Sequence, residues 1–166
     1  EIFEPGPNLR KTYANASSAT NMGLELEGRI GLRRLDRLMR RFTLISNLSL
    51  IKSQVDLPED VKGILTTSKR PLQGQSPYVF NFQVQYDYNP WGLQTTLLYN
   101  IIGERITEVG TNKRPDIYEM PFHQLDLVSS LKISGLGIIN LKLKNLLDLE
   151  AKSTQGSEFV KKEKKG

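Results

Sequence analysis

Three residues of this chain, His123, Asp126 and Ser129, are of the types that form a hydrolytic triad, and they lie close together in the sequence. If they belong to one strand, His123 and Ser129 share a face but are about 20 Å apart, and Asp126 points to the opposite face. A triad needs direct contact between its members. We therefore predict no catalytic residues in this segment.

Two carboxylates, Glu25 and Glu27, would lie about 7 Å apart on one face of a strand, a separation that two-carboxylate hydrolysis can use. Pairing with Arg29 or with basic groups on adjacent strands is the simpler interpretation. One histidine and no cysteine cannot assemble a transition-metal site. Gly135 and Gly137 lack the third glycine of a dinucleotide loop and indicate a turn. We predict no metal and no cofactor.

The elements that must carry these residues are strands, because apolar and polar side chains alternate along the chain. The alternation is clearest between Tyr78 and Tyr88. The ten steps of this segment cover about 33 Å, which a tilt of about 40° reduces to about 25 Å, the height of the apolar band of a membrane barrel. One face carries apolar and aromatic residues and the other mainly amides: Tyr78, Phe80, Phe82, Val84, Tyr86 and Tyr88 against Val79, Asn81, Gln83, Gln85 and Asp87.

Similar patterns predict about six antiparallel strands. Their ranges are 22–32, with a start nearer Tyr13, then 42–53, 78–88, 93–106, 122–133 and 138–147. The connections alternate in length: 34–40, 89–92 and 134–137 are short, whereas 57–76 and 107–121 are long. Compact soluble domains seldom contain structureless loops of about 15 to 20 residues, but outer-membrane barrels have short periplasmic turns and long extracellular loops. The expected fold is an all-β, antiparallel, up-and-down transmembrane β-barrel segment.

The composition permits this fold. The mean hydropathy is −0.38 and 38% of residues are hydrophobic. No apolar run approaches the length of about 18 residues that a spanning helix needs, whereas only every second residue of a barrel strand meets lipid. The net charge of +5 is concentrated in 33–41 and 161–165, without the continuous basic stripe and stacking aromatics of a nucleic-acid binder. The arginine-rich stretch fits a short amphipathic helix at anionic headgroups or, more simply, a solvated turn.

In a barrel, three groups of side chains have distinct expected places. Side chains expected to face the lumen are Glu25, Glu27, Arg29, Asn81, Gln83, Gln85, Asn100, Asp126, Lys142 and Lys144. Those expected to face lipid or form an aromatic girdle are Leu24, Leu26, Tyr78, Phe80, Phe82, Tyr86, Tyr88 and Trp91. Loops on a rigid scaffold often carry binding, so the ligand candidates in the extracellular loops are Lys69, Arg70, Gln73, Lys113, Arg114, Asp116 and Tyr118.

Five segments together carry a family resemblance: YANASSATNMGLELEG (13–28), RPLQGQSPYVFNFQVQY (70–86), WGLQTTLLYN (91–100), PDIYEMPFHQLDL (115–127) and KNLLDLE (144–150). In this order they resemble the C-terminal barrel part of a TonB-dependent outer-membrane receptor. The most specific elements are an Asn followed by G-x-E-x-E, a Pro-x-Gln-x-x-Pro approach to a strand, and Asn-Leu-x-Asp near the end of another.

The resemblance implies a barrel of about 22 strands with a plug inside it, which imports a scarce nutrient such as a siderophore, cobalamin or a glycan with energy passed on by TonB. Residues 1–166 would be one segment of that barrel, in the bacterial outer membrane, with no plug domain. Because open sheet edges cannot face hydrocarbon, we expect a portion of a longer polypeptide or pairing with other chains.

The expected partners are outer-membrane lipid, the remaining barrel and plug or other envelope chains, and TonB through the plug, but not nucleic acid. One alternative is a small self-contained or assembly-associated structural outer-membrane barrel. The other is a soluble ligand-binding β-barrel, because a soluble barrel also alternates.

Overall fold

The protein is built almost entirely of antiparallel strands. A computed structural model describes residues 2–4, 10–12, 16–37, 39–57, 67, 69–111 and 113–164. Their regular structure consists of strands and three short 3-10 turns, and every strand pair is antiparallel. None of the described segments is a helix of the length and apolarity that crossing a membrane requires.

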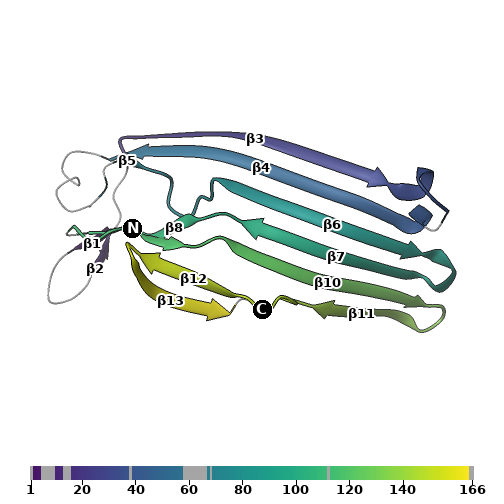
Figure 1. Ribbon diagram of the computed structural model, residues 1–166. Helices are drawn as coiled ribbons and strands as arrows, with labels where there is room; N and C mark the ends of the chain where they lie inside the picture. The colour runs from purple at the N-terminus through teal and green to yellow at the C-terminus, as the bar shows by residue number, and fades with distance from the viewer. Residues whose placement is uncertain are drawn as a thin grey trace.

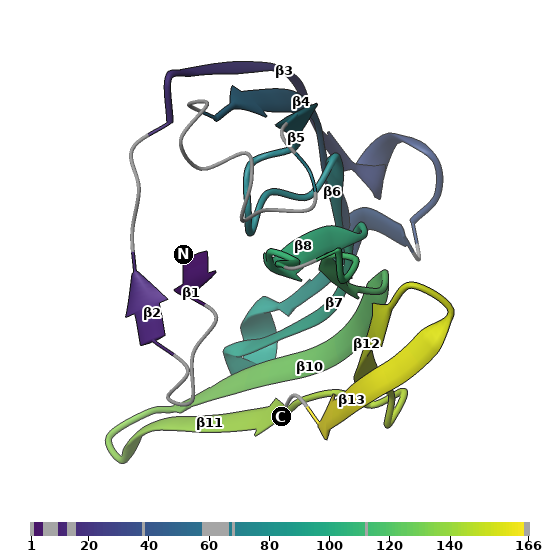
Figure 2. The same cartoon turned by 90° about the vertical axis from the view of Figure 1, so that its left-hand side faces the viewer.

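Six long strands form the main sheet in the spatial order β11-β10-β7-β6-β4-β3, as Figure 1 shows. Their bounds are β3 Ser18–Gly31, β4 Phe42–Asp56, β6 Tyr78–Tyr88, β7 Leu93–Ile102, β10 Phe122–Ile133 and β11 Gly137–Leu143. The short strand β5 (Lys69–Arg70) pairs with β4. The predicted all-β, antiparallel, up-and-down order is therefore confirmed. Figure 2 shows this sheet as a curved, twisted wall with β3 and β11 at opposite edges.

A smaller sheet continues three of these strands past a bend. Its order is β13-β12-β9-β8, with bounds β8 Arg105–Glu108, β9 Ile117–Glu119, β12 Glu150–Gln155 and β13 Glu158–Lys164. β8 prolongs β7, β9 precedes β10 and β12 follows β11, so the same neighbours pair on both sides of the bend. A third sheet pairs β1 (Ile2–Glu4) with β2 (Arg10–Thr12).

Several predicted boundaries were wrong. The first of the predicted strands is β3, which begins at Ser18, and Tyr13 lies outside the described residues. The predicted fourth strand, 93–106, is divided into β7 and β8. The long connections contain β5, β9 and the end of β8, because backbone groups near a sheet readily pair with it. The sixth strand ends at Leu143, so Lys144 lies in the connection that follows it and not on a strand face. The lysine-rich stretch from Lys161 is part of β13.

The arginine-rich stretch does not form an α-helix over its described residues. It contains two 3-10 turns, η1 (Leu32–Arg34) and η2 (Met39–Arg41). Leu38 lies outside the described residues. The described residues of this connection therefore form short turns between β3 and β4.

The strand register assigns each side chain to one of two faces, because directly paired residues lie on the same side of a sheet. One side, which we call the apolar face, includes Leu24, Leu26, Ile30, Leu44, Leu48, Phe80, Phe82, Val84, Tyr86, Leu97, Tyr99, Leu125, Leu127, Leu131, Ile139, Leu141 and Leu143. The other, the polar face, includes Glu25, Glu27, Arg29, Asn47, Ser49, Asn81, Gln83, Gln85, Asp87, Gln94, Asn100, Gln124, Asp126, Asn140 and Lys142. The period-two pattern thus extends across the whole sheet.

The β6–β7 connection is a tight turn, as its sequence predicts. Asn89, Pro90 and Trp91 form the 3-10 turn η3, and the Gly92 amide donates to the Asn89 carbonyl at 3.1 Å. Gly92 has φ 59°, in the left-handed region that glycine adopts without steric cost. The chain therefore reverses within the four residues that the type I turn pattern marked.

Gly103 marks the bend between β7 and β8. Its amide donates to the Tyr78 carbonyl at 3.0 Å, and a Cβ at this position would lie 2.6 Å from Tyr78 Cε1 and 2.9 Å from Ser76 Oγ. The tyrosine ring therefore covers the glycine and leaves no space for a side chain.

We expect Gly103→Ala to destabilise the fold by about 2 kcal/mol, because the added methyl must displace this ring. Gly28→Ala is the matched control, since no atom lies within 4 Å of a Cβ at Gly28. That control should be neutral or slightly stabilising, because alanine loses less conformational freedom in a strand. Urea unfolding midpoints of the two variants would measure the difference, and equal midpoints would contradict the packing of Tyr78 on Gly103.

Candidate functional site

The apolar face is open to the surroundings at both edges of the sheet. Leu24, Leu26 and Ile30 on β3 are 54–63% exposed, and Ile139 and Leu141 on β11 are 51–59% exposed. Phe82, on the same face in the middle of the sheet, is half-buried between neighbouring strands. Exposed apolar patches larger than a few hundred Å² mark interfaces with other proteins or with membranes.

Two pairs of polar side chains on the apolar face form hydrogen bonds with each other. Thr95 and Ser129 lie opposite each other on β7 and β10, with their hydroxyl oxygens 3.0 Å apart. His123 Nδ1 lies 2.8 Å from the Tyr99 hydroxyl oxygen. Hydrogen-bonded pairs lower the cost of placing polar groups in an apolar environment. The arrangement suits a surface that water does not reach.

The polar face carries a network of amides and carboxylates. Asn100 Nδ2 donates to Asn81 Oδ1 at 2.6 Å. Asp87 accepts from Gln85 Nε2 at 3.0 and 3.2 Å and from Gln94 Nε2 at 2.9 Å. Such rows of satisfied but accessible polar groups suit a surface that faces water or another polar protein surface.

At the end of the sheet with the long connections, the chain folds over the polar face. Val55, which pairs with Ala19 on that face, packs in a buried cluster with Leu57, Ile106 and Val109, with Leu72 and Tyr118 against it. Ile106 is 1% exposed. Among the described residues, this buried hydrophobic cluster therefore lies on the polar side of the sheet, at the end with the long connections.

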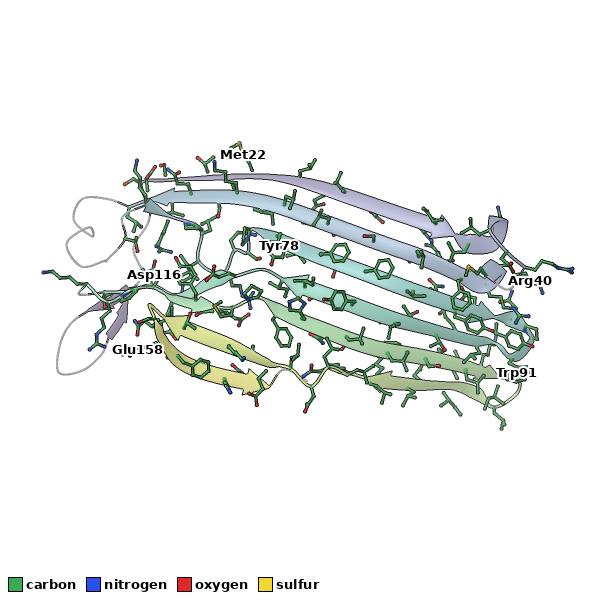
Figure 3. The ribbon with its side chains drawn as sticks, in the orientation of Figure 1. Met22, Arg40, Tyr78, Trp91, Asp116 and Glu158 are labelled. Atoms are coloured by element: carbon green, nitrogen blue, oxygen red, sulfur yellow. The ribbon has the colours of Figure 1, made fainter. Side chains whose placement is uncertain are left out.

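Asp116 holds this loop region together. It is 5% exposed, and its carboxylate accepts from the Gly110 amide at 2.7 Å and from Thr67 Oγ1 at 2.8 Å. Figure 3 places Asp116 at the same end of the molecule as Glu158, opposite Arg40 and Trp91. One carboxylate thus joins two long connections that are far apart in the sequence.

Charge in this region is partly desolvated. Burial lowers the pKa of Arg70, and the nearby Asp116 carboxylate and Tyr118 oppose that shift. Burial raises the pKa of Tyr118, as do the carboxylates of Asp116 and Glu104, while Arg70 lowers it. At neutral pH, Arg70 stays charged and Tyr118 stays neutral, because both ordinary values are far from 7.

The loop ligand candidates separate into two groups. Arg70, Asp116 and Tyr118 belong to the packed region just described, and Gln73 Nε2 donates to the Thr107 carbonyl at 2.7 Å. Lys69, Lys113 and Arg114 are exposed. Lys69 Nζ lies 3.9 Å from Asp56 Oδ1, and Lys113 has φ 66°.

A pocket of about 220 Å³ opens beside the packed loops. Its polar lining includes Lys52, Gln75, Glu104, Arg105 and Tyr118, among apolar groups of Ile51, Pro71, Pro77 and Ile106. Arg105 Nη2 contacts Glu119 Oε1 at 2.9 Å. Lys52, Gln75, Glu104 and Arg105 were not among the predicted ligand candidates, because only the fold brings them together.

The sequence Asn-Leu-x-Asp has a structural role that sequence reasoning left open. Asn145, 7% exposed with φ 51°, donates from Nδ2 to the Leu149 carbonyl at 3.0 Å and accepts from the Leu149 amide at 3.2 Å. Its own amide donates to Asp126 Oδ1 at 2.8 Å. The asparagine closes the turn between β11 and β12 and fixes it to β10.

At the short-turn end, aromatic rings and arginine form a rim. Tyr86 and Tyr88 stack with ring centroids 6.5 Å apart, and Trp91 meets Tyr88 edge-on at 5.1 Å. Phe42 lies 5.0 Å from Tyr86. The Arg41 guanidinium lies 4.1 Å from the centre of the Tyr88 ring. The predicted girdle residues Tyr86, Tyr88 and Trp91 thus lie together at this end.

The structure brings no catalytic constellation together from the candidates. Asp126 lies on the face opposite His123 and Ser129. Glu25 accepts a long hydrogen bond from Ser49 Oγ, at 3.5 Å, and within the described part of the chain neither Glu25 nor Glu27 forms an ion pair with Arg29. The described residues contain no cluster of three metal-ligating side chains.

Comparisons with protein-family models, with curated proteins and with solved structures gave no match.

Proposed function

We propose that this chain is part of the wall of an integral outer-membrane β-barrel. The observation that carries the proposal is the separation of the sheet into an uncovered apolar face and a polar face on which the loop core packs. In a soluble barrel the apolar face would line the interior and carry the core. Here the core lies on the polar side, where the loops of a membrane barrel fold into the mouth of the lumen.

The dimensions and the rim support the same proposal. The apolar face extends along β6 from Tyr78 to Tyr88, about 25 Å in height after tilt. Phe42, Tyr86, Tyr88 and Trp91 gather at one end of it. Aromatic girdles at the two water interfaces are typical of outer-membrane barrels.

We propose further that the barrel is of the TonB-dependent receptor type and takes part in uptake of a siderophore, cobalamin or glycan. This part depends on the resemblance of the five quoted segments. In the last of these segments, Asn145 and Asp148 both have φ 51°, and the Asp148 amide donates to the Asn145 carbonyl at 2.8 Å. Uptake that stops when TonB is deleted would support it. Uptake that continues in a strain without TonB would contradict the receptor type but not the membrane wall.

A nitroxide scan along β6 tests the membrane proposal directly, since the chain contains no cysteine that would also react. The protein carries a single labelled cysteine at each position from 79 to 87 in turn and is reconstituted in vesicles. The accessibility of the label to each relaxation agent should alternate with period two along the strand. Even-numbered positions should be relaxed by oxygen, which concentrates in lipid, and odd-numbered positions by a water-soluble nickel complex. Relaxation by oxygen at the odd-numbered positions and by nickel at the even-numbered positions would refute the assignment of the apolar face to lipid.

The direction across the membrane is tested at the two ends of the sheet. Lys113→Cys lies at the end with the long connections and Gly135→Cys at the end with the short turns. A membrane-impermeant maleimide on intact cells should label the first, and should label the second only after the outer membrane is disrupted. The reverse labelling would place the long connections in the periplasm.

A further inference from the structure

Four arginines surround two adjoining hollows at the short-turn end of the sheet. Each hollow has a volume of about 510 Å³, and both are lined by Arg33, Arg40 and Thr43. Arg41 lines one and Arg29 the other. The strand end of β3 and the turns η1 and η2 thus bring four guanidinium groups to one place.

These guanidinium groups lack carboxylate partners among the described residues. The ion pairs of the described part join other cations, such as Arg105 with Glu119. Asp87 lines one hollow, but its oxygens accept from the amides of Gln85 and Gln94. The site therefore carries a concentrated positive charge, which favours an anion with several oxygen acceptors.

The hollows adjoin the apolar face as well as the polar one. Ile30 and Phe42, both on the apolar face, line one of them. Arg41 stacks on Tyr88 and donates from Nη1 to the Tyr86 hydroxyl at 3.4 Å. Figure 3 places Arg40 and Trp91 at this same end of the sheet. An anion bound here would therefore lie next to an apolar surface at the level of the aromatic rim.

We propose that these arginines bind the phosphate of an anionic phospholipid headgroup, with the acyl chains of that lipid against Ile30 and Phe42. Guanidinium forks match phosphate oxygens in a bidentate geometry that the ammonium of lysine cannot reproduce. A free phosphate shares the headgroup chemistry but gains nothing from the apolar side chains. The inference rests on the proposed membrane location and adds a specific lipid to it.

Trp91 reports on this site, because it is the only tryptophan of the chain and follows Asn89 and Pro90, which line one hollow. The protein is reconstituted in phosphatidylcholine vesicles that contain brominated phosphatidylglycerol or brominated phosphatidylcholine. Quenching of Trp91 fluorescence by the two lipids then gives their relative binding. Wild-type protein should prefer phosphatidylglycerol, and Arg33→Gln/Arg40→Gln should reduce the preference about fivefold for each guanidinium removed.

Matched variants separate a specific site from general positive charge. Lys161→Gln/Lys162→Gln removes the same charge from β13 in the smaller sheet and should leave the preference unchanged. Arg37→Gln removes an exposed arginine of the same connection that lines neither hollow and should have little effect. Arg33→Lys/Arg40→Lys keeps the charge but should retain only part of the preference.

The outcomes that overturn the inference are distinct from those that overturn the membrane proposal. An unchanged preference in Arg33→Gln/Arg40→Gln, or equal losses in both charge-removing double variants, would refute a lipid site at these arginines. Competition by millimolar inorganic phosphate without any lipid preference would identify a small-anion site instead. If neither brominated lipid quenches Trp91, membrane insertion itself is refuted.

Discussion

Leu97→Arg is expected to destabilise the protein in a bilayer by about 2–4 kcal/mol, the cost of placing arginine on the lipid side of a barrel at mid-depth. Leu97 lies on the apolar face, between Val84 of β6 and Leu127 of β10. Both neighbours are aliphatic and offer no partner for a guanidinium. Urea titration of folding into vesicles would measure the loss.

Leu98→Arg is the matched control, because it makes the same change one residue further along the same strand. Leu98 lies on the polar face, between Gln83 of β6 and Asp126 of β10. An arginine there meets an amide and a carboxylate, so we expect a change of less than about 1 kcal/mol. A costly Leu98→Arg together with a tolerated Leu97→Arg would show that the two faces are assigned the wrong way round.

Asp116→Ala is expected to open the loop region at the other end, with a local loss of about 3 kcal/mol. The substitution leaves the buried Gly110 amide without its acceptor and removes the carboxylate beside Arg70. An unsatisfied buried donor and an uncompensated, partly buried charge both carry such costs. Hydrogen exchange at the Gly110 amide would measure the change as faster exchange.

Glu108→Ala removes an acidic residue from the same region but from an exposed position on β8. It should leave exchange at Gly110 close to the wild-type rate. Exchange in the main sheet, for example at Phe82, should be unaffected by either substitution, because the loop core lies at one end only. Slow exchange at Gly110 in Asp116→Ala would contradict the role assigned to this carboxylate.

The long strands could be predicted because successive residues of a strand lie on opposite faces of the sheet, so apolar and polar residues alternate over many positions. From Tyr78 to Tyr88 only Val79 departs from the alternation, and the register pairs the apolar and aromatic residues of the other face with residues of the same face on β4 or β7. Single exceptions such as Ile45 did not disturb the prediction. Ile45 pairs with Gln83 on the polar face, where an occasional aliphatic side chain is tolerated.

The short strands and the loop core could not be predicted in this way. β8 and β9 have four and three residues, too few for a periodic signal. Their pairing follows from the strands they prolong, β7 and β10. The burial of Asp116 depends on Thr67 and Gly110, which only the folded chain brings near it. The bend at Gly103 likewise depends on the Tyr78 ring.

The number of strands restricts how the proposed barrel can be completed. The main sheet contributes six strands of alternating direction, and β13, which pairs with β12 where the chain continues from β11, adds a seventh past the bend. An antiparallel cylinder closes without a parallel seam only if its total number of strands is even, so an odd number of further strands would have to complete the proposed barrel. At the other margin, one of them would have to pair with the outward amides and carbonyls of β3 along Ser18–Gly31.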